Sequence, residues 1–288
     1  MDMKGIILAG GSGTRLYPST LVMVKQLLPV YDKPMIYYPL SNLITAGIKD
    51  ILIISTKEAI LLFETLLGDG SDLGINLQYK VQEKPNGLAE SFILGEEFLN
   101  GSSCCLVLGD NIFFGQGFSR KIKQAAKERT GARIFGYHVS DPERYGVVEF
   151  NSLREVLSIE EKPDNPKSNY AVTGLYFFDS TVVEKAKNVK PSKRGELEIT
   201  EVIQQYLDEG SLKCSLLGGG TAWLDSGTHQ SLLQASDFVE AIQQRQGLLV
   251  GSIEESAYKS NFIDREKLLT LATKYEKSSY GQMLKKIV

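Results

Sequence analysis

The chain has 288 residues, of which 42% are hydrophobic and 23% are charged, and its formal net charge is −3. This composition excludes wholesale disorder, and the slightly acidic balance leaves no basic footprint for nucleic acid over the whole chain. No apolar run approaches the roughly 20 residues of a membrane span, and the first residues lack the features of a signal peptide. We therefore expect a cytoplasmic protein with neither a nucleic acid nor a membrane as partner.

The few cysteines and histidines limit the chemistry that the chain can perform. Cys104, Cys105 and Cys214 are an odd number, two of them are adjacent, and no C-x-x-C spacing occurs. This pattern fits neither a disulfide framework nor a zinc site. His138 and His229 are the two histidines, so a histidine metal cluster or a Ser-His-Asp triad has little material.

Short apolar runs alternate with amphipathic stretches along the first half of the chain. The pattern predicts strands over residues 5–9, 50–55, 77–81, 104–108 and 132–139. It predicts helices over residues 39–46, 57–67, 88–99 and 118–129. Such alternation is typical of βαβ units, and continuous apolar strands are typical of a sheet covered on both faces. The sequence therefore predicts an α/β fold with a mostly parallel central sheet flanked by helices.

The second half of the chain is less regular. Strands are predicted over residues 147–150, 155–159 and 172–178, and the turns between them suggest an insertion of antiparallel strands. Residues 228–288 are expected to be mostly helical, with a break at residues 258–262. The sequence contains no internal repeat, low-complexity segment or Pro/Gly-rich linker, so we predict a single domain over residues 1–288.

A glycine-rich loop directly follows the first predicted strand, where residues 8–16 read LAGGSGTRL. Glycine lets a ligand approach the backbone closely, and consecutive free N–H groups form a concavity that binds anions. The Arg15 guanidinium has the fork geometry that suits phosphate. The loop is neither a Walker A motif nor a G-x-G-x-x-G fingerprint. It predicts a phosphate site, and an ordinary tight turn is the alternative.

Polar residues follow several other predicted strands or lie close to the loop. Lys25 could contact phosphates, and the amides of Gln26 and Gln82 could recognise a base. Asp110 and Asp225 each end an apolar run, and carboxylates in such positions suit Mg²⁺. Ligands of α/β proteins collect beyond the carboxyl ends of the strands. Taken singly, each of these residues could instead be a solvated side chain, a cap or a turn residue.

Two neighbouring charges end a strand in the second half. Glu161 could accept hydrogen bonds from sugar hydroxyls, and Lys162 could neutralise a phosphate. The backbone of Gly146, next to Tyr145, could add a sugar contact. An exposed salt bridge between Glu161 and Lys162 is the alternative interpretation.

Together these motifs resemble the bacterial glucose-1-phosphate thymidylyltransferases, a branch of the sugar nucleotidyltransferase superfamily. The resemblance covers nearly the whole chain. It is carried by KGIILAGGSGTRLYP at 4–18, KQLLP at 25–29, YDKPMIYYPL at 31–40, LGDN at 108–111, DPERYGVVEF at 141–150, EEKP at 160–163, RGELEIT at 194–200 and AWLD at 222–225. The family pattern has a serine before KQLLP, and this chain has Val24 there.

The resemblance implies a Rossmann-like core with an inserted antiparallel sugar-binding part and a helical C-terminal region. Residues 1–140 would mainly bind the nucleotide, residues 141–227 the sugar phosphate, and residues 228–288 would serve oligomerisation or regulation. The implied reaction is Mg²⁺-dependent transfer from dTTP to α-D-glucose 1-phosphate, giving dTDP-glucose and pyrophosphate, the first step toward dTDP-L-rhamnose. The family is typically a homotetramer that dTDP-rhamnose inhibits at a second site between subunits.

The resemblance also assigns roles to individual residues. The nucleotide would be bound by Leu8, Ala9, Gly10, Gly11, Ser12, Gly13, Thr14, Arg15, Lys25, Gln26, Gln82, Pro85, Gly87 and Asp110. The sugar phosphate would be bound by Asn111, Tyr145, Gly146, Glu161, Lys162, Val172 and Trp223. The catalytic residues would be Arg15, Asp110, Lys162 and Asp225, with Asp110 and Asp225 holding Mg²⁺.

The implied chemistry needs no general base. A sugar phosphate is largely doubly ionised at neutral pH, since the second pKa of a phosphomonoester is about 6, so it can attack the α-phosphorus in line.

Two alternative functions remain open from the sequence. The enzyme could use UTP or another sugar phosphate, or the chain could be a non-catalytic sugar-nucleotide sensor. A pure sensor would not need the full charged set of Arg15, Asp110, Lys162 and Asp225.

Overall fold

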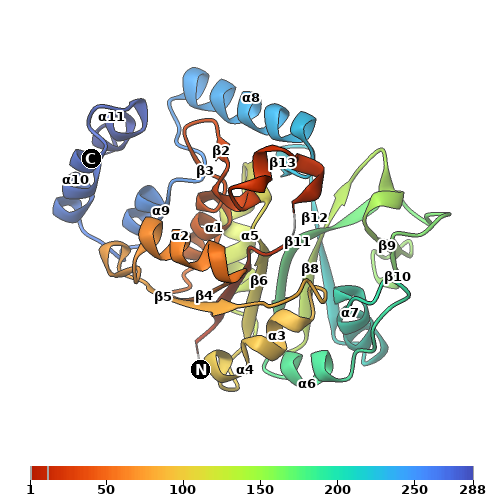
Figure 1. Cartoon of the computed structure of the whole chain (residues 1–288). Coiled ribbons are helices and arrows are strands. Elements are labelled where there is room, and N and C mark those ends of the chain that lie inside the picture. Colours follow the sequence, from red (N-terminus) through yellow and green to blue (C-terminus); the bar gives the residue numbers. More distant parts are fainter. Residues whose placement is uncertain (1, 12, 288) are drawn as a thin grey trace.

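A mixed sheet runs through the centre of the molecule in the computed structural model, and helices cover both of its faces (Figure 1). The structure describes residues 2–11 and 13–287. Four neighbouring strands are parallel, in the order β5 (Asn76–Val81), β4 (Asp50–Ser55), β1 (Lys4–Leu8) and β6 (Cys104–Leu108). The order continues with antiparallel β11 (Tyr170–Phe178), then β8 (Ala132–His138) and β12 (Leu212–Leu217), which are parallel to each other. The predicted α/β fold with a mostly parallel sheet is confirmed.

Alternate residues of the central strands face opposite sides of the sheet, which creates two cores. Ile7 and Ile53 belong to one core, and Ile6 and Leu52 belong to the other. The first core includes residues of α1 (Tyr37–Thr45), α2 (Lys57–Leu67), α5 (Phe118–Ala125), α9 (Ile253–Lys259), α10 (Arg265–Lys274) and α11 (Ser279–Lys285). The second includes residues of α3 (Glu90–Leu94), α4 (Glu96–Leu99), α6 (Val182–Lys187) and α7 (Ile199–Asp208). Both faces are therefore buried, as the continuous apolar strands predicted.

Two predicted helices differ in extent from the prediction. The helix expected over residues 88–99 is divided at Gly95, which ends α3 and precedes α4. A Cβ at Gly95 would lie 3.0 Å from the Ile6 side chain, so the glycine allows close packing on β1. The helix expected over residues 118–129 ends at Ala125, and the Arg129 guanidinium donates to the Ala126 carbonyl at 2.8 Å just beyond it.

The insertion of antiparallel strands is confirmed. Strands β9 (Gly146–Phe150) and β10 (Val156–Glu161) form a hairpin at the edge of the sheet. Val147 of β9 pairs with Ala171 near the start of β11, which attaches the hairpin to the sheet. The hairpin therefore extends from the sheet on the side away from the C-terminal helices (Figure 1).

Two short ribbons were not predicted, and neither were strand β12 and helices α6 and α7. Strands β7 (Asn111–Gly115) and β13 (Thr221–Asp225) form an antiparallel pair, as do β2 (Pro29–Val30) and β3 (Lys33–Pro34). Because β7 begins just after β6 ends, Asp110 lies in the turn between them. Single turns of 3₁₀ helix complete the fold: η1 (Thr14–Leu16), η2 (Ser19–Leu21), η3 (Lys25–Leu27), η4 (Ser71–Leu73) and η5 (Pro142–Arg144).

The region after the last strand is helical, as predicted. It begins with α8 (His229–Gln246), which starts at a capping box between Thr228 and Ser231. The predicted break falls between α9 and α10, and a second break separates α8 from α9. In the part of the chain that the structure describes, no helix has the length and apolar character to cross a membrane.

Candidate active site

Two adjoining cavities open at the carboxyl ends of β1 and β6. The larger measures about 460 Å³ and the smaller about 210 Å³, and Leu88, Leu108 and Asp110 line both. The larger cavity is also lined by Arg15, Asn111, Arg144, Tyr145, Gly146, Glu161, Lys162, Val172, Gly174, Tyr176, Arg194, Ile199, Thr200, Trp223 and Asp225. The smaller is also lined by Leu8, Gly10, Gly11, Gln26, Gln82, Pro85, Gly87 and Glu196. The fold thus brings most of the predicted site residues together around Asp110.

The glycine loop forms one wall of the smaller cavity. Gly11 has φ +100° and Gly13 has φ +57°, backbone conformations that glycine adopts readily. A Cβ on Gly10 would lie 2.9 Å from Gln82 Oε1, so a side chain at this position would collide with that amide. The predicted phosphate ligand Ser12 lies outside the described residues. The loop therefore passes close to the cavity with its backbone exposed to a ligand.

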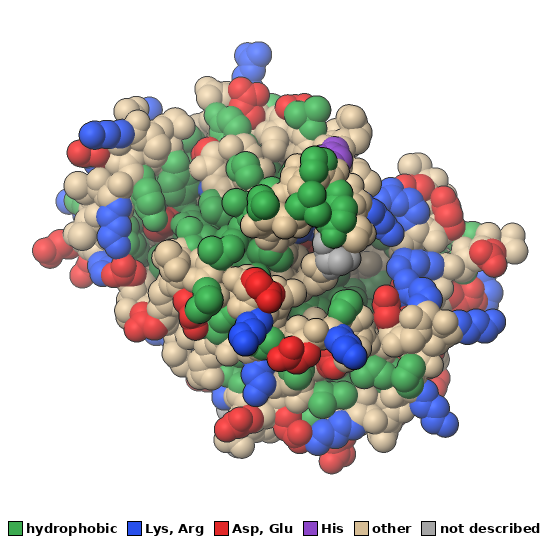
Figure 2. Space-filling model, viewed as in Figure 1, with side chains coloured by type: hydrophobic (Ala, Val, Ile, Leu, Met, Phe, Trp, Pro, Cys, Tyr) green, Lys and Arg blue, Asp and Glu red, His purple; other side chains and the backbone are tan. Residues whose placement is uncertain are grey.

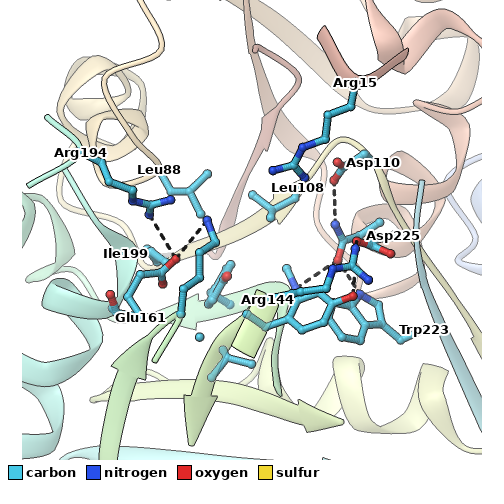
Figure 3. Close-up of a pocket in the computed structure, with 18 residues that line it drawn as sticks. Arg15, Leu88, Leu108, Asp110, Arg144, Glu161, Arg194, Ile199, Trp223 and Asp225 are labelled. Atoms are coloured by element: carbon cyan, nitrogen blue, oxygen red, sulfur yellow. Dashed lines mark hydrogen bonds and ion pairs between the residues drawn. The ribbon is translucent and has the colours of Figure 1, made fainter. Parts of the chain in front are cut away.

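Some predicted residues lie near the cavities without lining them. Ala9 is buried inside the sheet, where its carbonyl accepts a hydrogen bond from the Ser55 hydroxyl at 2.7 Å. Gly13 and Thr14 continue the loop toward Arg15, whose side chain lies at the larger cavity (Figure 3). These positions shape the loop rather than the cavity wall.

The segment between Arg15 and Lys25 carries exposed hydrophobic side chains. Val22 is 89% exposed and Leu21 is 64% exposed. Figure 2 shows hydrophobic side chains gathered over this part of the molecule, above the red segment of Figure 1. His229 Nε2, at the start of α8, lies 3.1 Å from the carbonyl oxygen of Tyr17. The segment therefore contacts α8 on one side and the glycine loop on the other, where the Thr20 hydroxyl donates to the Gly13 carbonyl at 2.7 Å.

Val24 occupies the position before η3 at which the family pattern has a serine. Its backbone is extended, its side chain makes no capping hydrogen bond, and it packs against the core. The carbonyl of Val24 still accepts the backbone N–H of Leu27 at 3.0 Å. The turn that carries Lys25 and Gln26 therefore forms with a valine in front of it.

Lys25 and Gln26 point toward Asp110 and the glycine loop respectively. Lys25 Nζ lies 2.6 Å from Asp110 Oδ2. Gln26 is buried, and its Nε2 lies 3.4 Å from the Gly10 carbonyl oxygen. Among the residues that the structure describes, none provides a hydrogen-bond partner for Gln26 Oε1. An unpartnered buried acceptor is costly, so this oxygen is suited to a donor on a ligand.

Asn111 holds Asp110 in place. Its Nδ2 donates to Asp110 Oδ1 at 2.8 Å. Its Oδ1 accepts the indole N–H of Trp223 at 2.6 Å and the backbone N–H of Gly174 at 3.1 Å. Asn111 is buried, so these contacts leave its amide a single orientation. The carboxylate of Asp110 is thus fixed at the boundary between the two cavities.

Asp225 lies beside Asp110 because the β7–β13 ribbon pairs it with Asn111. Asp225 Oδ2 lies 3.5 Å from both the Tyr145 hydroxyl and the Arg144 guanidinium. Burial and the charge of Asp225 raise the pKa of Tyr145 to about 12. The phenol therefore keeps its proton at neutral pH and can donate a hydrogen bond.

The pair of aspartates is chemically suited to Mg²⁺. No group of three or more His, Cys, Asp or Glu side chains that could hold a metal occurs among residues 2–11 and 13–287. Mg²⁺ often binds one or two carboxylates and takes its remaining ligands from phosphates and water. Asp110 and Asp225 line the same cavity as Arg15 and Lys162, which suits a metal shared with a phosphate ligand.

The opposite wall of the larger cavity carries a charged cluster from the hairpin and the loop before α7. Figure 3 shows Glu161 and Arg194 on this wall, across from Asp110 and Asp225. Glu161 Oε1 lies 3.3 Å from the Arg194 guanidinium and 3.6 Å from Lys162 Nζ. Burial raises the pKa of the Glu161 carboxyl, and the charges of Lys162 and Arg194 oppose that rise.

Lys162 has a strained backbone at this wall. Its φ is +43°, in the left-handed region that lysine rarely adopts, and its N–H donates to the Tyr145 carbonyl at 3.0 Å. Strain of this kind is concentrated at functional sites. Nearby, a Cβ on Gly146 would lie 3.2 Å from Thr200 and 3.4 Å from Glu161, so glycine keeps the wall open.

Two cationic residues of the cavity were not assigned a role from the sequence. Arg144 and Arg194 both line it, and each lies within a segment that carried the family resemblance, DPERYGVVEF and RGELEIT. Their location in these segments was the sequence signal that could have identified both arginines as site residues. Leu88, Leu108, Gly174, Tyr176, Glu196, Ile199 and Thr200 were also missed. Of these, Leu88, Gly174 and Tyr176 lie outside the segments that carried the resemblance, so only the fold places them at the cavities.

Comparisons with known proteins identify the family of the chain. Residues 4–242 match the family described as Nucleotidyl transferase. A glucose-1-phosphate thymidylyltransferase of Neisseria meningitidis is 57% identical over 286 residues, 99% of each chain. One of Mycolicibacterium smegmatis is 54% identical over 282 residues, 98% of each chain.

Two solved structures share the overall fold. A chain described as a glucose-1-phosphate thymidylyltransferase of Bacillus anthracis, in complex with sucrose, matches with a TM-score of 0.76 at 43% identity. The match covers 82% of this chain and 94% of that one. A UDP-glucose pyrophosphorylase complexed with UDP-glucose shares the fold, with a TM-score of 0.72 at 22% identity over 85% of this chain and 100% of that one. The resemblance found in the sequence is confirmed, and the chain belongs to the nucleotidyl transferase family and, within it, to the glucose-1-phosphate thymidylyltransferases.

Proposed function

We propose that the protein transfers a thymidylyl group from dTTP to α-D-glucose 1-phosphate, giving dTDP-glucose and pyrophosphate. The observation that carries the proposal is the position of Asp110, which lines two adjoining cavities at the carboxyl ends of parallel strands. Two substrates bound there would meet at one carboxylate. The family membership of the chain supports dTTP and a sugar 1-phosphate as these substrates.

The smaller cavity would hold the nucleoside of dTTP. Gln82 and the unpartnered Gln26 Oε1 would recognise the nucleoside, beside Pro85 and Gly87. The triphosphate would follow the glycine loop toward Arg15, with Lys25 as a second cation. Backbone N–H groups and guanidinium forks are the usual ligands of phosphate oxygens.

The larger cavity would hold the sugar phosphate. Lys162 and Arg194 would neutralise its phosphate, while Glu161 would accept hydrogen bonds from sugar hydroxyls. Tyr145, Gly146 and Val172 would line the sugar, with Asn111 and Trp223 behind Asp110.

We include Mg²⁺ in the proposal, held by Asp110 and Asp225. When bound, it would neutralise phosphate charge and act as a Lewis acid. The residues of the chain supply the rest of the site. Asn111 fixes Asp110, and Arg144 and Tyr145 lie against Asp225, so both carboxylates keep their direction when the substrates bind.

The reaction would be a direct displacement. An oxygen of the sugar phosphate forms a bond to the α-phosphorus of dTTP, and the bond from that phosphorus to the pyrophosphate oxygen breaks. No proton has to be removed, since the phosphate nucleophile is already ionised near neutral pH. Lys162 would hold the nucleophile against repulsion, and Arg15 would stabilise charge on the leaving pyrophosphate.

The proposal extends to the biological setting that the family resemblance implies. The product would enter dTDP-L-rhamnose synthesis, and the enzyme would be a homotetramer with dTDP-rhamnose as feedback inhibitor at an intersubunit site. Residues 228–288 would serve assembly or regulation, residues 1–140 mainly the nucleotide and residues 141–227 mainly the sugar phosphate.

The test is pyrophosphate release by the purified protein with Mg²⁺, glucose 1-phosphate and each of dTTP, UTP, CTP, ATP and GTP. We expect the highest rate with dTTP, loss of activity with EDTA, and dTDP-glucose as the product on chromatography. A preference for UTP would mean that the reaction is the proposed one but that the nucleotide substrate is UTP and not dTTP. Binding of dTTP without turnover would mean that the protein is a sugar-nucleotide sensor and not an enzyme.

A further inference from the structure

Glu90 lies next to the smaller cavity without lining it and has no role in the proposed function so far. It is the first residue of α3, and its carboxylate accepts hydrogen bonds from two side-chain amides. Gln82 Nε2 donates to Glu90 Oε2 at 2.7 Å, and Asn86 Nδ2 donates to Glu90 Oε1 at 2.7 Å. Each carboxylate oxygen therefore holds one amide group.

This contact determines which end of the Gln82 amide reaches the cavity. A carboxylate accepts hydrogen bonds and donates none, so Gln82 must turn its NH₂ group toward Glu90. The carbonyl oxygen then faces away from Glu90. Gln82 Oε1 indeed lies on the side of the glycine loop, 2.9 Å from the place of a Cβ on Gly10, and Gln82 lines the smaller cavity.

Burial makes the orientation of the Gln82 amide costly to reverse. Gln82 is 6% exposed, so an inverted amide would place its carbonyl oxygen against the Glu90 carboxylate with little water to separate them. Asn86 contributes as well, because its hydrogen bond holds the Glu90 carboxylate in place. Glu90 thus keeps Gln82 as a hydrogen-bond acceptor toward the cavity.

We propose that Glu90 is a positioning residue that determines pyrimidine specificity by holding the Gln82 carbonyl toward the nucleobase. The inference rests on the proposed function, in which the smaller cavity holds the nucleobase. Thymine and uracil carry an N–H donor at N3, whereas cytosine carries an acceptor there. The Gln82 carbonyl would accept from thymine N3 and would face the lone pair of cytosine N3.

The primary test compares kcat/KM for dTTP and dCTP in the wild type and in Glu90→Gln, with glucose 1-phosphate saturating. A glutamine at this position can donate to Gln82 Oε1, which lets the Gln82 amide turn over. We expect the preference for dTTP over dCTP to fall by about 10-fold or more. The loss for dTTP should be mainly in KM, because the base lies away from the reacting phosphorus.

The matched control is Glu96→Gln, which makes the same chemical change on the neighbouring helix α4. Glu96 is paired with Lys187 at the surface and lines neither cavity. Its nucleotide preference should equal that of the wild type. A structural defect in Glu90→Gln would instead lower the rates with both nucleotides in parallel, and that result would overturn the inference.

A modified substrate tests the same idea in the wild-type protein. N3-methyl-dTTP lacks the donor that the Gln82 carbonyl would accept, so we expect it to react at least about 10-fold less efficiently than dTTP. Equal use of the two substrates would overturn the inference even if Glu90→Gln did not fold. If the wild type is active and a folded Glu90→Gln protein keeps the same preference for dTTP over dCTP, this inference alone is overturned. A wild type that releases no pyrophosphate with any nucleotide would overturn the proposed function as well.

Discussion

Two lysines close together in the sequence, Lys25 and Lys33, form ion pairs with opposite surroundings. Lys25 contacts Asp110 at the cavities, where the Asp110 side chain is 28% exposed. Lys33 contacts Asp32 in the interior, where the Lys33 side chain is 1% exposed. The first pair can exchange one partner for a ligand, and the second cannot.

The buried pair belongs to a polar network beneath the C-terminal helices. Lys33 Nζ donates to Gln243 Oε1 of α8 at 3.1 Å and lies 5.3 Å from the ring centre of Tyr280 in α11. The Tyr280 hydroxyl donates in turn to Glu254 of α9. Burial lowers the pKa of Lys33 and raises the pKa of Glu254, although each opposes the other's shift.

A lysine–carboxylate pair therefore serves different purposes according to its access to solvent. The buried network joins three C-terminal helices to the β2–β3 ribbon, so we expect it to contribute to stability and to the geometry of that region. Lys25 and Asp110 lie at a site that would bind anions, so we expect them to contribute to turnover.

The largest expected effect is on stability, in Lys33→Met. Removing one partner of a buried charge pair typically costs about 3–5 kcal/mol, because the other charge remains buried without compensation. Urea denaturation should show that loss in the free energy of unfolding, while the folded fraction keeps its kcat. A loss in kcat without a loss in stability would contradict the distinction between the two pairs.

Asp110→Asn should have the converse effect. It keeps the size of the side chain and removes the charge shared by both cavities, so we expect kcat to fall by about 10² or more. The melting temperature should stay close to that of the wild type, as measured by circular dichroism. Near-normal turnover in the folded variant would remove Asp110 from the mechanism.

Arg194→Ala should have a smaller effect, confined to one substrate. Arg194 lines the larger cavity and not the smaller one, so we expect KM for glucose 1-phosphate to rise about 10-fold, which corresponds to one lost charge-assisted hydrogen bond. KM for dTTP should be unchanged in steady-state kinetics. An equal rise in both KM values would mean that the two cavities do not separate the two substrates.

The smallest effect is expected at the surface. Hydrogen bonds from Lys267 and Lys274 lower the pKa of Asp72 from its ordinary value of 3.8 to about 2. The folded form therefore favours ionised Asp72, a contribution that is present above about pH 4 and is lost as the pH falls toward 2. Solvent screens this exposed cluster, so Asp72→Asn should cost less than about 1 kcal/mol at pH 7. Urea denaturation at pH 7 and pH 2 should show that difference disappear in acid, and a difference that persisted would contradict this assignment.

The sequence predicted the parallel strands and the helices of the first half of the chain because their apolar patterns are continuous, but it did not predict β12, α6 or α7. The strands around Ile7 and Ile53 are buried on both faces, which leaves an uninterrupted apolar run. The short β2–β3 and β7–β13 ribbons were missed, since they contain few residues and depend on tertiary pairing. Without the β7–β13 ribbon, the sequence could not explain why Asp225 lies beside Asp110.

The candidate site was predicted in its motifs and not in its supporting contacts. The glycine loop, Asp110 and Lys162 lie in segments that resemble a known family. The clamp of Glu90 on Gln82 joins two ordinary polar residues, and no local pattern distinguishes it from a solvated pair. Contacts of this kind depend on the direction of side chains, which spacing along the chain does not specify.

Direct displacement between two substrates that meet at Asp110 fixes the stereochemistry at the α-phosphorus, and this stereochemistry can be measured. The experiment uses one diastereomer of dTTP with sulfur on the α-phosphorus, together with glucose 1-phosphate, and determines the configuration of the thio-product. A single in-line displacement predicts inversion at phosphorus. Retention would require two displacements through a nucleotidyl-enzyme, and it would contradict the direct meeting of the two substrates.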